Sequence, residues 1–560
     1  MRHEYSLYFS ALFFSFMIAV MGAMGTFVFS LNAAMSGTEG EIFLTRLVAQ
    51  YKVATDEPSE RVDFNINVNG EEKKYSIPSV VFLQKTAGEW ADIKVKLWVV
   101  GAVSIFSGLG IFFLTNWAWQ RFGRGVGVDE VVRGTQLADV NDVKAEMQKN
   151  GKAGKVHFAG VPLEAGKEVL NMMVSGAIGT GKSVAISEAL SDIRQSGMKA
   201  FVFDPTGEYI QRFYRPGVDV ILNPFDERSP LWRPWNEVRM PYDYANLAES
   251  FIPVTNPKEK FWEEGAQAVL EDVMSRLAKE GRATNRNLVE VVNLLSLAEI
   301  QQLVRALPGA VYMDPEAGKT SLGIRMNVVK AAKALRFMGD GEGQFSVRGW
   351  VEAGGDGWLF LSTREDMLVV MRPLLTAWFD TALRAVMTLP PDRNRLIWNV
   401  MDELASLNKI PTLKEATTRA RKYGLASILG YQNIAQLREI YGFNDAQTIV
   451  SSCQSTLTLR VPDHQTAEFI AKNLGSQEIY ERDENISFGA ASANDGVSIT
   501  TKRVDKALVM TSEIQGLPDL MGYMRLAGRN DVMKVQLSYR EYPSVAEPFV
   551  MKEVLTYALD

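Results

Sequence analysis

The chain has 560 residues, of which 47% are hydrophobic, and a net charge of −6. This length allows about three or four domains, and the acidic balance excludes a basic nucleic-acid coat, so contact with a polyanion requires a local basic surface. The single cysteine, Cys453, excludes an internal disulfide and a cysteine metal cluster, and the three scattered histidines argue against zinc or Cys/His catalysis.

Two uncharged apolar stretches near the N-terminus are long enough to cross a membrane. They are Leu7 to Leu31 and Leu97 to Trp119, and a hydrocarbon core needs about 20 residues. The first is longer than a typical signal-peptide core and a second span follows it, which favours a retained anchor over a cleaved signal. The second ends in two tryptophans and is followed by Arg121, which favours a membrane interface over a buried core helix.

The positive flanks predict the orientation of these spans. Arg2 precedes the first span, and Arg121 and Arg124 follow the second, so we expect both termini in the cytoplasm. The segment between the spans, residues 32–96, is expected to form a small α/β domain that faces the periplasm of a Gram-negative cell. Residues 62–77 alternate apolar and polar side chains around an Asn-Gly turn, which predicts a β-hairpin.

Residues 176–183 form a complete G-x-x-x-x-G-K-[ST] pattern. An apolar strand precedes it and a helix from Lys182 to about Arg194 follows, which is the setting of a phosphate-binding loop. Lys182 would reach the β and γ phosphates, and Ser183 would ligate Mg²⁺. The alternative is a glycine-rich turn without a ligand, but every required position is filled. The candidate nucleotide-binding residues are Gly176, Ala177, Gly179, Thr180, Gly181, Lys182 and Ser183.

The chain then continues with the alternating strands and helices of a parallel sheet. A buried strand ends in Asp204, which either positions a metal or water or caps the following turn. From about Tyr242 to Met338 strand-like runs vanish, and helical periodicity predicts an all-helical insertion. The basic stretch Arg325 to Arg336 within it is either a helix that faces nucleic acid or a solvated face.

Beyond the insertion, a second apolar strand over residues 395–401 ends in Asp402 and Glu403. Hydrolysis of a nucleoside triphosphate needs one carboxylate for the Mg²⁺ shell and one base to orient water. Asp402 suits the first role and Glu403 the second. This pair is a weak pattern alone, but it follows a complete phosphate loop at a distance of 220 residues (402 minus 182).

Two further side chains are candidates for the same chemistry. Gln432 ends the strand over residues 426–432 and either senses the γ-phosphate and attacking water or caps a loop. Arg421 lies in a basic stretch and either neutralises charge at a neighbouring nucleotide or solvates a helix end. Residues 485–506 are expected as a mobile loop or hairpin, and residues 532–539 as a closing strand.

In layout and motifs the chain resembles the type IV coupling proteins of bacterial conjugation, and within them the TraD family. The resemblance covers essentially the whole chain, although the membrane part matches in layout only. It is carried, beyond the common ATPase motifs, by Arg133-Gly134-Thr135-Gln136-Leu137, Asp204-Pro205-Thr206-Gly207-Glu208, Leu222-Asn223-Pro224-Phe225-Asp226, Asp402-Glu403-Leu404-Ala405-Ser406-Leu407, Arg421-Lys422-Tyr423-Gly424 and the stretch from Ser512 to Leu520.

The resemblance implies an α/β fold: a RecA-like P-loop NTPase domain with an all-helical insertion, preceded by two transmembrane helices flanking a small periplasmic α/β domain. The implied boundaries are 1–31 and 97–119 for the spans, 32–96 for the periplasmic domain, 120–241 and 339–560 for the RecA-like domain, and 242–338 for the all-α domain.

The resemblance also implies a homo-hexamer in the bacterial inner membrane that uses ATP and Mg²⁺. Its implied partners are single-stranded DNA gripped without sequence preference, the relaxase and other relaxosome proteins, and the inner-membrane components of a type IV secretion system. It implies that Lys182, Ser183, Asp402 and Glu403 bind and hydrolyse the nucleotide, with Ser183 and Asp402 at the metal. Arg421 would act as a finger across subunits, and Gln432 falls at the third ATPase motif of the family.

Some TraD proteins carry a long C-terminal tail that binds a relaxosome accessory protein. This chain ends soon after the ATPase domain, so the helical insertion is the expected docking element instead. Three rival functions stay open: a chromosome-partition or DNA-processing translocase of the same superfamily, a transporter ATPase, and a docking scaffold without catalysis. A transporter would carry a Ser-Gly-Gly-Gln signature, and the intact Lys182, Asp402 and Glu403 argue against a mere scaffold.

Overall fold

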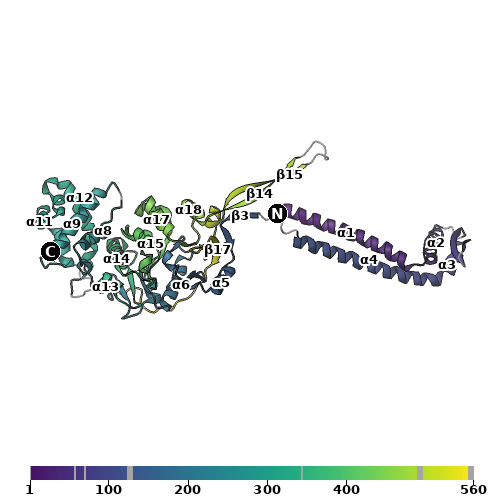
Figure 1. Ribbon diagram of the computed structural model, residues 1–560, viewed down its shortest axis with the longest axis horizontal. Helices are drawn as coiled ribbons and strands as arrows, with labels where there is room; N and C mark the ends of the chain where they lie inside the picture. The colour runs from purple at the N-terminus through teal and green to yellow at the C-terminus, as the bar shows by residue number, and fades with distance from the viewer. Residues whose placement is uncertain are drawn as a thin grey trace. The chain divides into compact units, whose positions relative to one another are not determined.

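The computed structural model describes residues 2–55, 59–68, 71–122, 130–255, 257–341, 345–487 and 496–552. The chain divides into two compact units, residues 1–130 and 131–560 (Figure 1). The first unit contains two long apolar helices and a small α/β domain. The second contains a large sheet, the helices that cover it and a helical insertion.

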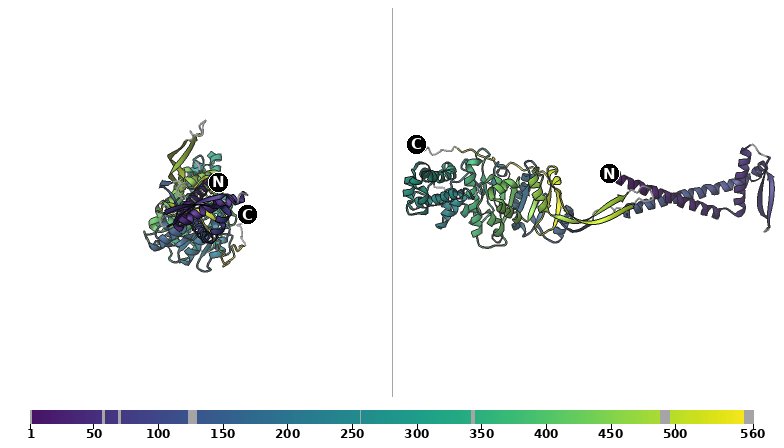
Figure 2. Two further views of the ribbon diagram at one scale, coloured as in Figure 1. Left: turned by 90° about the vertical axis from the view of Figure 1, so that its right-hand side faces the viewer. Right: turned by 90° about the horizontal axis from the view of Figure 1, so that it is seen from above.

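The first unit is built on the helices α1 (Arg2–Ala34) and α4 (Ala87–Phe122), which cross in Figure 2. Their segments 12–34 and 87–119 have mean hydropathies of 2.1 and 2.2 and are long enough to cross a membrane. Small residues let the two backbones approach: a Cβ built on Gly108 would lie 3.0 Å from the Cβ of Ala23. Small side chains at the contact are typical of helices that associate in hydrocarbon.

Between these helices lie α2 (Gly37–Ala54), β1 (Arg61–Val68), β2 (Glu71–Pro78) and α3 (Ser79–Lys85). The antiparallel pair β1 and β2 confirms the predicted hairpin, while its Asn69-Gly70 turn lies outside the described residues. Helix α2 was not predicted, although the sequence carries its signal. Ser36 and Glu39 form a capping box at its start, and their Ser-x-x-Glu spacing is the sequence pattern that predicts such a box.

The second unit is organised around a mixed sheet that has ten strands among the described residues. Their order is β4-β17-β16-β13-β7-β12-β11-β8-β10-β9. All neighbours from β9 to β13 are parallel, whereas β16 runs antiparallel to both β13 and β17. The strands are β4 (Gln136–Ala138), β7 (Met172–Ser175), β8 (Lys199–Asp204), β9 (Val220–Leu222), β10 (Trp358–Ser362), β11 (Ile397–Met401), β12 (Leu425–Tyr431), β13 (Ser455–Thr458), β16 (Met521–Arg525) and β17 (Asp531–Gln536).

Helices cover both faces of this sheet and form three separate buried clusters with it. These helices are α5 (Val140–Lys149), α6 (Lys182–Gln195), α7 (Glu208–Phe213), α13 (Val347–Glu352), α14 (Leu368–Thr388), α15 (Leu413–Arg419), α16 (Ile434–Tyr441), α17 (Phe443–Ser452), α18 (His464–Leu474) and α19 (Thr511–Gln515). A small pair, β5 (Ala153–Phe158) and β6 (Val161–Glu164), packs beside α6. The order of parallel strands and helices confirms the predicted α/β fold.

A separate three-stranded sheet consists of β3 (Glu130–Gly134), β14 (Ser476–Ser487) and β15 (Gly496–Ala507), in the order β15-β14-β3. The long antiparallel pair β14 and β15 is therefore the hairpin that the sequence offered as an alternative to a mobile loop. Residues 488–495 at its tip lie outside the described residues.

The helical insertion is also confirmed, because the described residues between β9 and β10 form helices and, apart from isolated bridges at Asp226, Trp232 and Phe345, no strand. Besides α13, they are α8 (Tyr242–Phe251), α9 (Lys260–Lys279), α10 (Asn285–Leu294), α11 (Leu297–Leu303) and α12 (Gly318–Ala332), with short 3-10 turns. Arg325 of α12 donates from Nε and Nη2 to the carbonyls of Val292 and Asn293 at 3.0 and 2.8 Å. This guanidinium closes the end of α10, so it does not form part of a free basic face.

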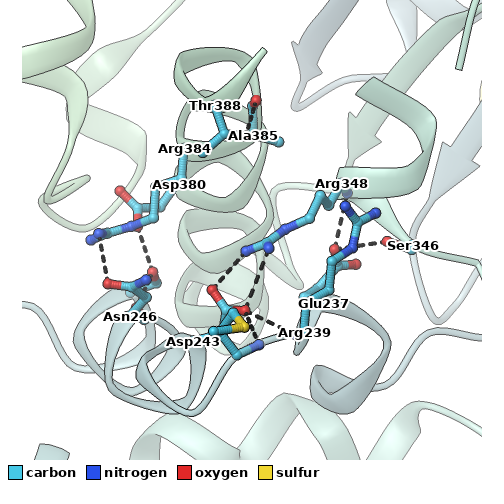
Figure 3. Close-up of polar contacts among 12 residues, drawn as sticks. Glu237, Arg239, Asp243, Asn246, Ser346, Arg348, Asp380, Arg384, Ala385 and Thr388 are labelled. Carbon is cyan, nitrogen blue, oxygen red and sulfur yellow. Dashed lines mark hydrogen bonds and ion pairs between the residues drawn. The ribbon is translucent and has the colours of Figure 1, made fainter. Parts of the chain in front are cut away.

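A buried polar network ties the insertion to helix α14 (Figure 3). Asp380 of α14 is completely buried and accepts hydrogen bonds from Ser250 Oγ of α8 and from Arg384 Nε, both at 2.6 Å. Its second oxygen accepts from the backbone N–H of Thr412 at 2.9 Å. Arg384 also donates to Asn246 Oδ1 at 3.0 Å. One carboxylate therefore links the insertion, α14 and the segment that begins α15.

A second network beside it joins the segment that enters the insertion to the segment that leaves it (Figure 3). The buried Asp243 accepts from Arg348 Nη2 at 2.8 Å. The buried Glu237 accepts from Ser346 Oγ at 2.9 Å and from the backbone N–H of Val347 at 2.7 Å. Buried charges require such partners, so the insertion is held at a defined angle to α14.

We expect Arg384→Ala to destabilise the protein by about 3 kcal/mol, because the buried Asp380 carboxylate loses its counter-charge. Thermal and denaturant unfolding of the detergent-solubilised chain measures the change. Lys472→Ala is the control, since Lys472 forms an exposed i,i+4 pair with Glu468 and should cost less than about 1 kcal/mol. Equal losses for the two variants would contradict the role given to the Asp380 network.

Candidate nucleotide-binding site

The loop between β7 and α6 has the backbone geometry of a phosphate cradle. Gly179 and Gly181 have φ angles of 78° and 111°, a region that favours glycine. Gly176 is required for a different reason, because a Cβ there would lie 2.8 Å from Thr180 Oγ1. Thr180 Oγ1 in turn donates to the carbonyl of Ala177 at 2.8 Å. The predicted loop residues thus form one compact turn at the N-terminus of α6, where anions bind.

Neighbouring segments hold this loop from two sides. The backbone N–H of Ala177 donates to the carbonyl of Arg460 at 2.9 Å, just beyond β13. The carbonyl of Thr180 accepts from the N–H of Leu520 at 3.0 Å, and the side chain of Leu520 lies against Gly181. The stretch from Ser512 to Leu520, singled out in the sequence, therefore supports the phosphate loop.

The structure brings four predicted site residues together. Lys182 Nζ lies 3.0 Å from Glu403 Oε2 and 3.6 Å from Asp402 Oδ1. Ser183 Oγ donates to Asp402 Oδ2 at 3.0 Å. The Lys182 side chain is only 8% exposed, and both carboxylates are 15% exposed. A nearly buried ammonium is thus neutralised by two carboxylates that follow β11, which a single strand, β12, separates from β7.

These donors fit a nucleotide with a divalent cation. Hydroxyl and carboxylate oxygens such as Ser183 Oγ and the Asp402 carboxylate are the ligands that Mg²⁺ prefers, and Mg²⁺ is usually held by one or two protein groups together with phosphates. Within the described residues no cluster of three or more His, Cys, Asp or Glu side chains could hold a metal alone. Phosphate oxygens and water would therefore have to complete the coordination shell.

Gln432 lies at the same edge of the sheet. It directly follows β12, which pairs with β7 on one side and with β11 on the other. The backbone of β12 lies close to the backbone of Asp402, because a Cβ on Gly430 would lie 1.9 Å from the backbone carbonyl oxygen of Asp402. Parallel strands end at a common edge, so Gln432 stands between the phosphate loop and the two carboxylates.

Arg421 is not part of this cluster within one chain. It lies in the 3-10 turn Ala420–Tyr423, which precedes β12, and its side chain is exposed. Gln432 follows the same strand, whose seven residues span about 23 Å at 3.3 Å per residue. The structure therefore places Arg421 at the opposite edge of the sheet from the phosphate loop.

Asp204 caps the turn that follows β8. Its Oδ2 accepts from the backbone N–H of Ile210 at 2.7 Å, which supports the capping alternative. The side chain is completely buried, and this burial raises its pKa to about 7. Among the described residues its Oδ1 has no hydrogen-bond partner.

One contact at the site was not predicted. Tyr209 of α7 donates its hydroxyl to Asp402 Oδ2 at 3.0 Å. In the sequence, a tyrosine on a short helix indicates only a core residue. No motif links it to a carboxylate that lies 193 residues later in the chain.

Comparison with known proteins gives consistent matches over most of the chain. Residues 155–538 match the family described as the type IV secretion-system coupling protein DNA-binding domain. The chain is 30% identical to the coupling protein TraD of Escherichia coli K12 over 472 residues, which cover 82% of this chain and 66% of TraD. It is 28% identical to the type IV secretion system-coupling protein VirD4 of Bartonella quintana over 24% of this chain and 20% of VirD4. The chain thus spans less than two thirds of the length of these curated relatives.

Two solved structures share the fold over three quarters of the chain. The unbound bacterial conjugative coupling protein TrwBdeltaN70 is 31% identical, with a TM-score of 0.69, and the match covers 76% of this chain and 96% of TrwBdeltaN70. The plasmid coupling protein TrwB in complex with ADP and Mg²⁺ is 31% identical, with a TM-score of 0.68, and the match covers 75% of this chain and 98% of TrwB.

The raised pKa of Asp204 predicts a specific pH dependence. The folded state keeps a proton that the unfolded chain loses near its ordinary pKa, so stability falls as pH rises from about 4 to about 7. Asp204→Asn removes this titration. The free energy of unfolding of the variant should therefore fall less steeply over that pH range, with a slope smaller by up to about 1.4 kcal/mol per pH unit. Denaturant unfolding of both proteins at pH 5, 6 and 7 measures the difference. Parallel pH profiles would show that Asp204 titrates normally.

Proposed function

Because the chain belongs to the family of type IV secretion-system coupling proteins, we propose that it is an inner-membrane ATPase that drives DNA transfer in bacterial conjugation. It would connect relaxase-bound single-stranded DNA to the secretion channel. The observation that carries this proposal is the convergence of Lys182 and Ser183 with Asp402 and Glu403 at one edge of the sheet. An ammonium, a hydroxyl and two carboxylates in this arrangement are the groups that catalyse transfer of a phosphoryl group to water.

We assign the following roles to the residues of this site. The phosphate loop, residues 176–183, binds the phosphates of ATP through its backbone N–H groups, and Lys182 neutralises their charge. Mg²⁺, when bound, supplies further neutralisation of the β and γ phosphate oxygens. Ser183 and Asp402 are the protein groups that would hold it, and Glu403 orients the attacking water as general base. The solved complex of the relative TrwB with ADP and Mg²⁺ supports these cofactors.

Gln432 and Arg421 complete the proposed site in different ways. Gln432 stands at the edge between the loop and the carboxylates, where an amide can contact the γ-phosphate or the attacking water. Arg421 is exposed at the opposite edge, which suits a guanidinium that serves the nucleotide of a neighbouring subunit in a homo-hexamer. Each subunit would then hydrolyse ATP only when a neighbouring subunit supplies Arg421.

The remaining assignments concern the membrane and the substrate. We assign the spans to residues 1–31 and 97–119, with both termini in the cytoplasm and residues 32–96 in the periplasm. The RecA-like domain comprises residues 120–241 and 339–560, and the all-α domain comprises residues 242–338. DNA would be gripped through its phosphates without base readout, while the all-α domain meets the relaxosome and the membrane unit meets inner-membrane components of the secretion system.

We expect donor cells that carry Lys182→Ala to transfer DNA at least about a hundredfold less often, because one lost charge contact at the reacting phosphates costs that much. Donor growth and division should remain normal. Lys472→Ala, an exposed lysine on α18 with a side chain 75% exposed, is the matched control and should transfer normally. Normal transfer by Lys182→Ala donors with mis-segregated DNA would favour a partition translocase, and no effect at all would favour a docking scaffold.

We expect Arg421→Ala and Lys182→Ala proteins to complement each other when they are mixed. Each is inactive alone, but a Lys182→Ala subunit still offers its arginine to the intact site of an Arg421→Ala neighbour. DNA-stimulated ATP hydrolysis in mixed detergent-solubilised assemblies measures this recovery. Lys422→Ala, the adjacent exposed cation, should hydrolyse ATP normally. A mixture without recovered hydrolysis would mean that Arg421 serves only its own chain.

A further inference from the structure

Asp402 accepts hydrogen bonds from two hydroxyl groups at the same oxygen, and the proposed function gives a role to only one of these donors, Ser183. Ser183 Oγ and the Tyr209 hydroxyl both donate to Asp402 Oδ2, each at 3.0 Å. The second oxygen, Oδ1, lies 3.6 Å from Lys182 Nζ. The two donors therefore fix one oxygen of this carboxylate and leave the other directed toward the phosphate-binding lysine.

Tyr209 reaches Asp402 from the protein interior. Its side chain is only 2% exposed, and it belongs to the buried cluster that also contains Phe213 and Phe360. A buried hydroxyl without a partner costs free energy, so a tyrosine at this position is favourable only while Asp402 accepts its hydrogen bond. A phenylalanine would fill the same space without this requirement.

Helix α7, which carries Tyr209, is held at both ends. At its start, Asp204 caps the N–H of Ile210 at 2.7 Å, and a Cβ on Gly207 would lie 2.6 Å from the carbonyl oxygen of Pro548. At its end, the carbonyl of Gln211 accepts from the N–H of Val545 at 2.8 Å. The C-terminal segment therefore packs along α7, and the Tyr209 hydroxyl has a fixed position relative to β8.

We propose that Tyr209 is a positioning residue that holds the Asp402 carboxylate in the orientation needed for Mg²⁺ bound with nucleotide. Hydrogen bonds from groups behind a metal ligand orient that ligand and raise its affinity for the metal. Donors to a carboxylate also form stronger hydrogen bonds than neutral pairs do. This inference rests on the proposed function only in that Asp402 faces the metal.

The test compares Mg²⁺ dependence in wild type and Tyr209→Phe. Binding of a fluorescent ADP analogue to the detergent-solubilised full chain is titrated with MgCl₂, and then repeated in EDTA. We expect the Mg²⁺ concentration for half-maximal binding to rise about tenfold, with unchanged binding in EDTA and an unchanged melting temperature. Tyr441→Phe is the matched control, because its buried hydroxyl accepts from the N–H of Ile410 at 3.4 Å and does not touch Asp402.

Two further measurements separate positioning from packing. In an Asp402→Asn background, adding Tyr209→Phe should not change the Mg²⁺ requirement further, whereas an additional tenfold loss would overturn the proposal. Tyr209→Leu removes the same hydroxyl with a different volume and should give the same Mg²⁺ shift. A loss of ADP binding that is equal with Mg²⁺ and in EDTA, or no shift in either variant, would also overturn it.

The outcome can be distinguished from a failure of the proposed function. Binding of the ADP analogue reports on Tyr209 even if the wild-type chain neither hydrolyses ATP nor supports DNA transfer. Conversely, a wild type that hydrolyses ATP and transfers DNA, together with a Tyr209→Phe variant that shows no Mg²⁺ shift, would overturn only the inference about Tyr209.

Discussion

The pairing of one nearly buried ammonium with two carboxylates is the interaction on which the functional part of this structure depends. Lys182 lies between Asp402 and Glu403, at 3.6 and 3.0 Å. A charge that is so little exposed requires compensation, and these carboxylates supply it while keeping their oxygens at the mouth of the phosphate loop. Phosphates that enter the loop would meet a lysine already held in place, so little reorganisation is needed for catalysis.

The order of strands in the sheet brings these groups together. One strand, β12, separates β7 from β11, and its Gly430 leaves no room for a side chain beside Asp402. Three strands therefore end at one edge with a loop, an amide and two carboxylates. The same parallel order carries Arg421 to the other edge of the sheet. In the role proposed for Arg421, it would complete the site of a neighbouring subunit.

The helical insertion and the site share supporting structure. Asp380 of α14 binds Ser250 of the insertion and Thr412, and Thr412 precedes α15, which leads to the turn that carries Arg421. A fully buried carboxylate with several donors tolerates little displacement. A change in the angle of the insertion would therefore act on the segment before Arg421.

The sequence by itself determined the phosphate loop, the strand ending in Asp402 and Glu403, the helical insertion and the two apolar spans. Each depends on residues that are neighbours in the chain, so spacing, periodicity and glycine placement are enough to predict it. Only the tertiary structure decided which alternative applies to Asp204, that Arg421 lies at the opposite edge of the sheet from the phosphate loop, and that Tyr209 binds Asp402. The Asp204 contact is short in sequence, but the pattern fits both alternatives and only the geometry separates them. The other two findings relate residues distant in sequence, and strand order, which local patterns do not encode, sets their distances.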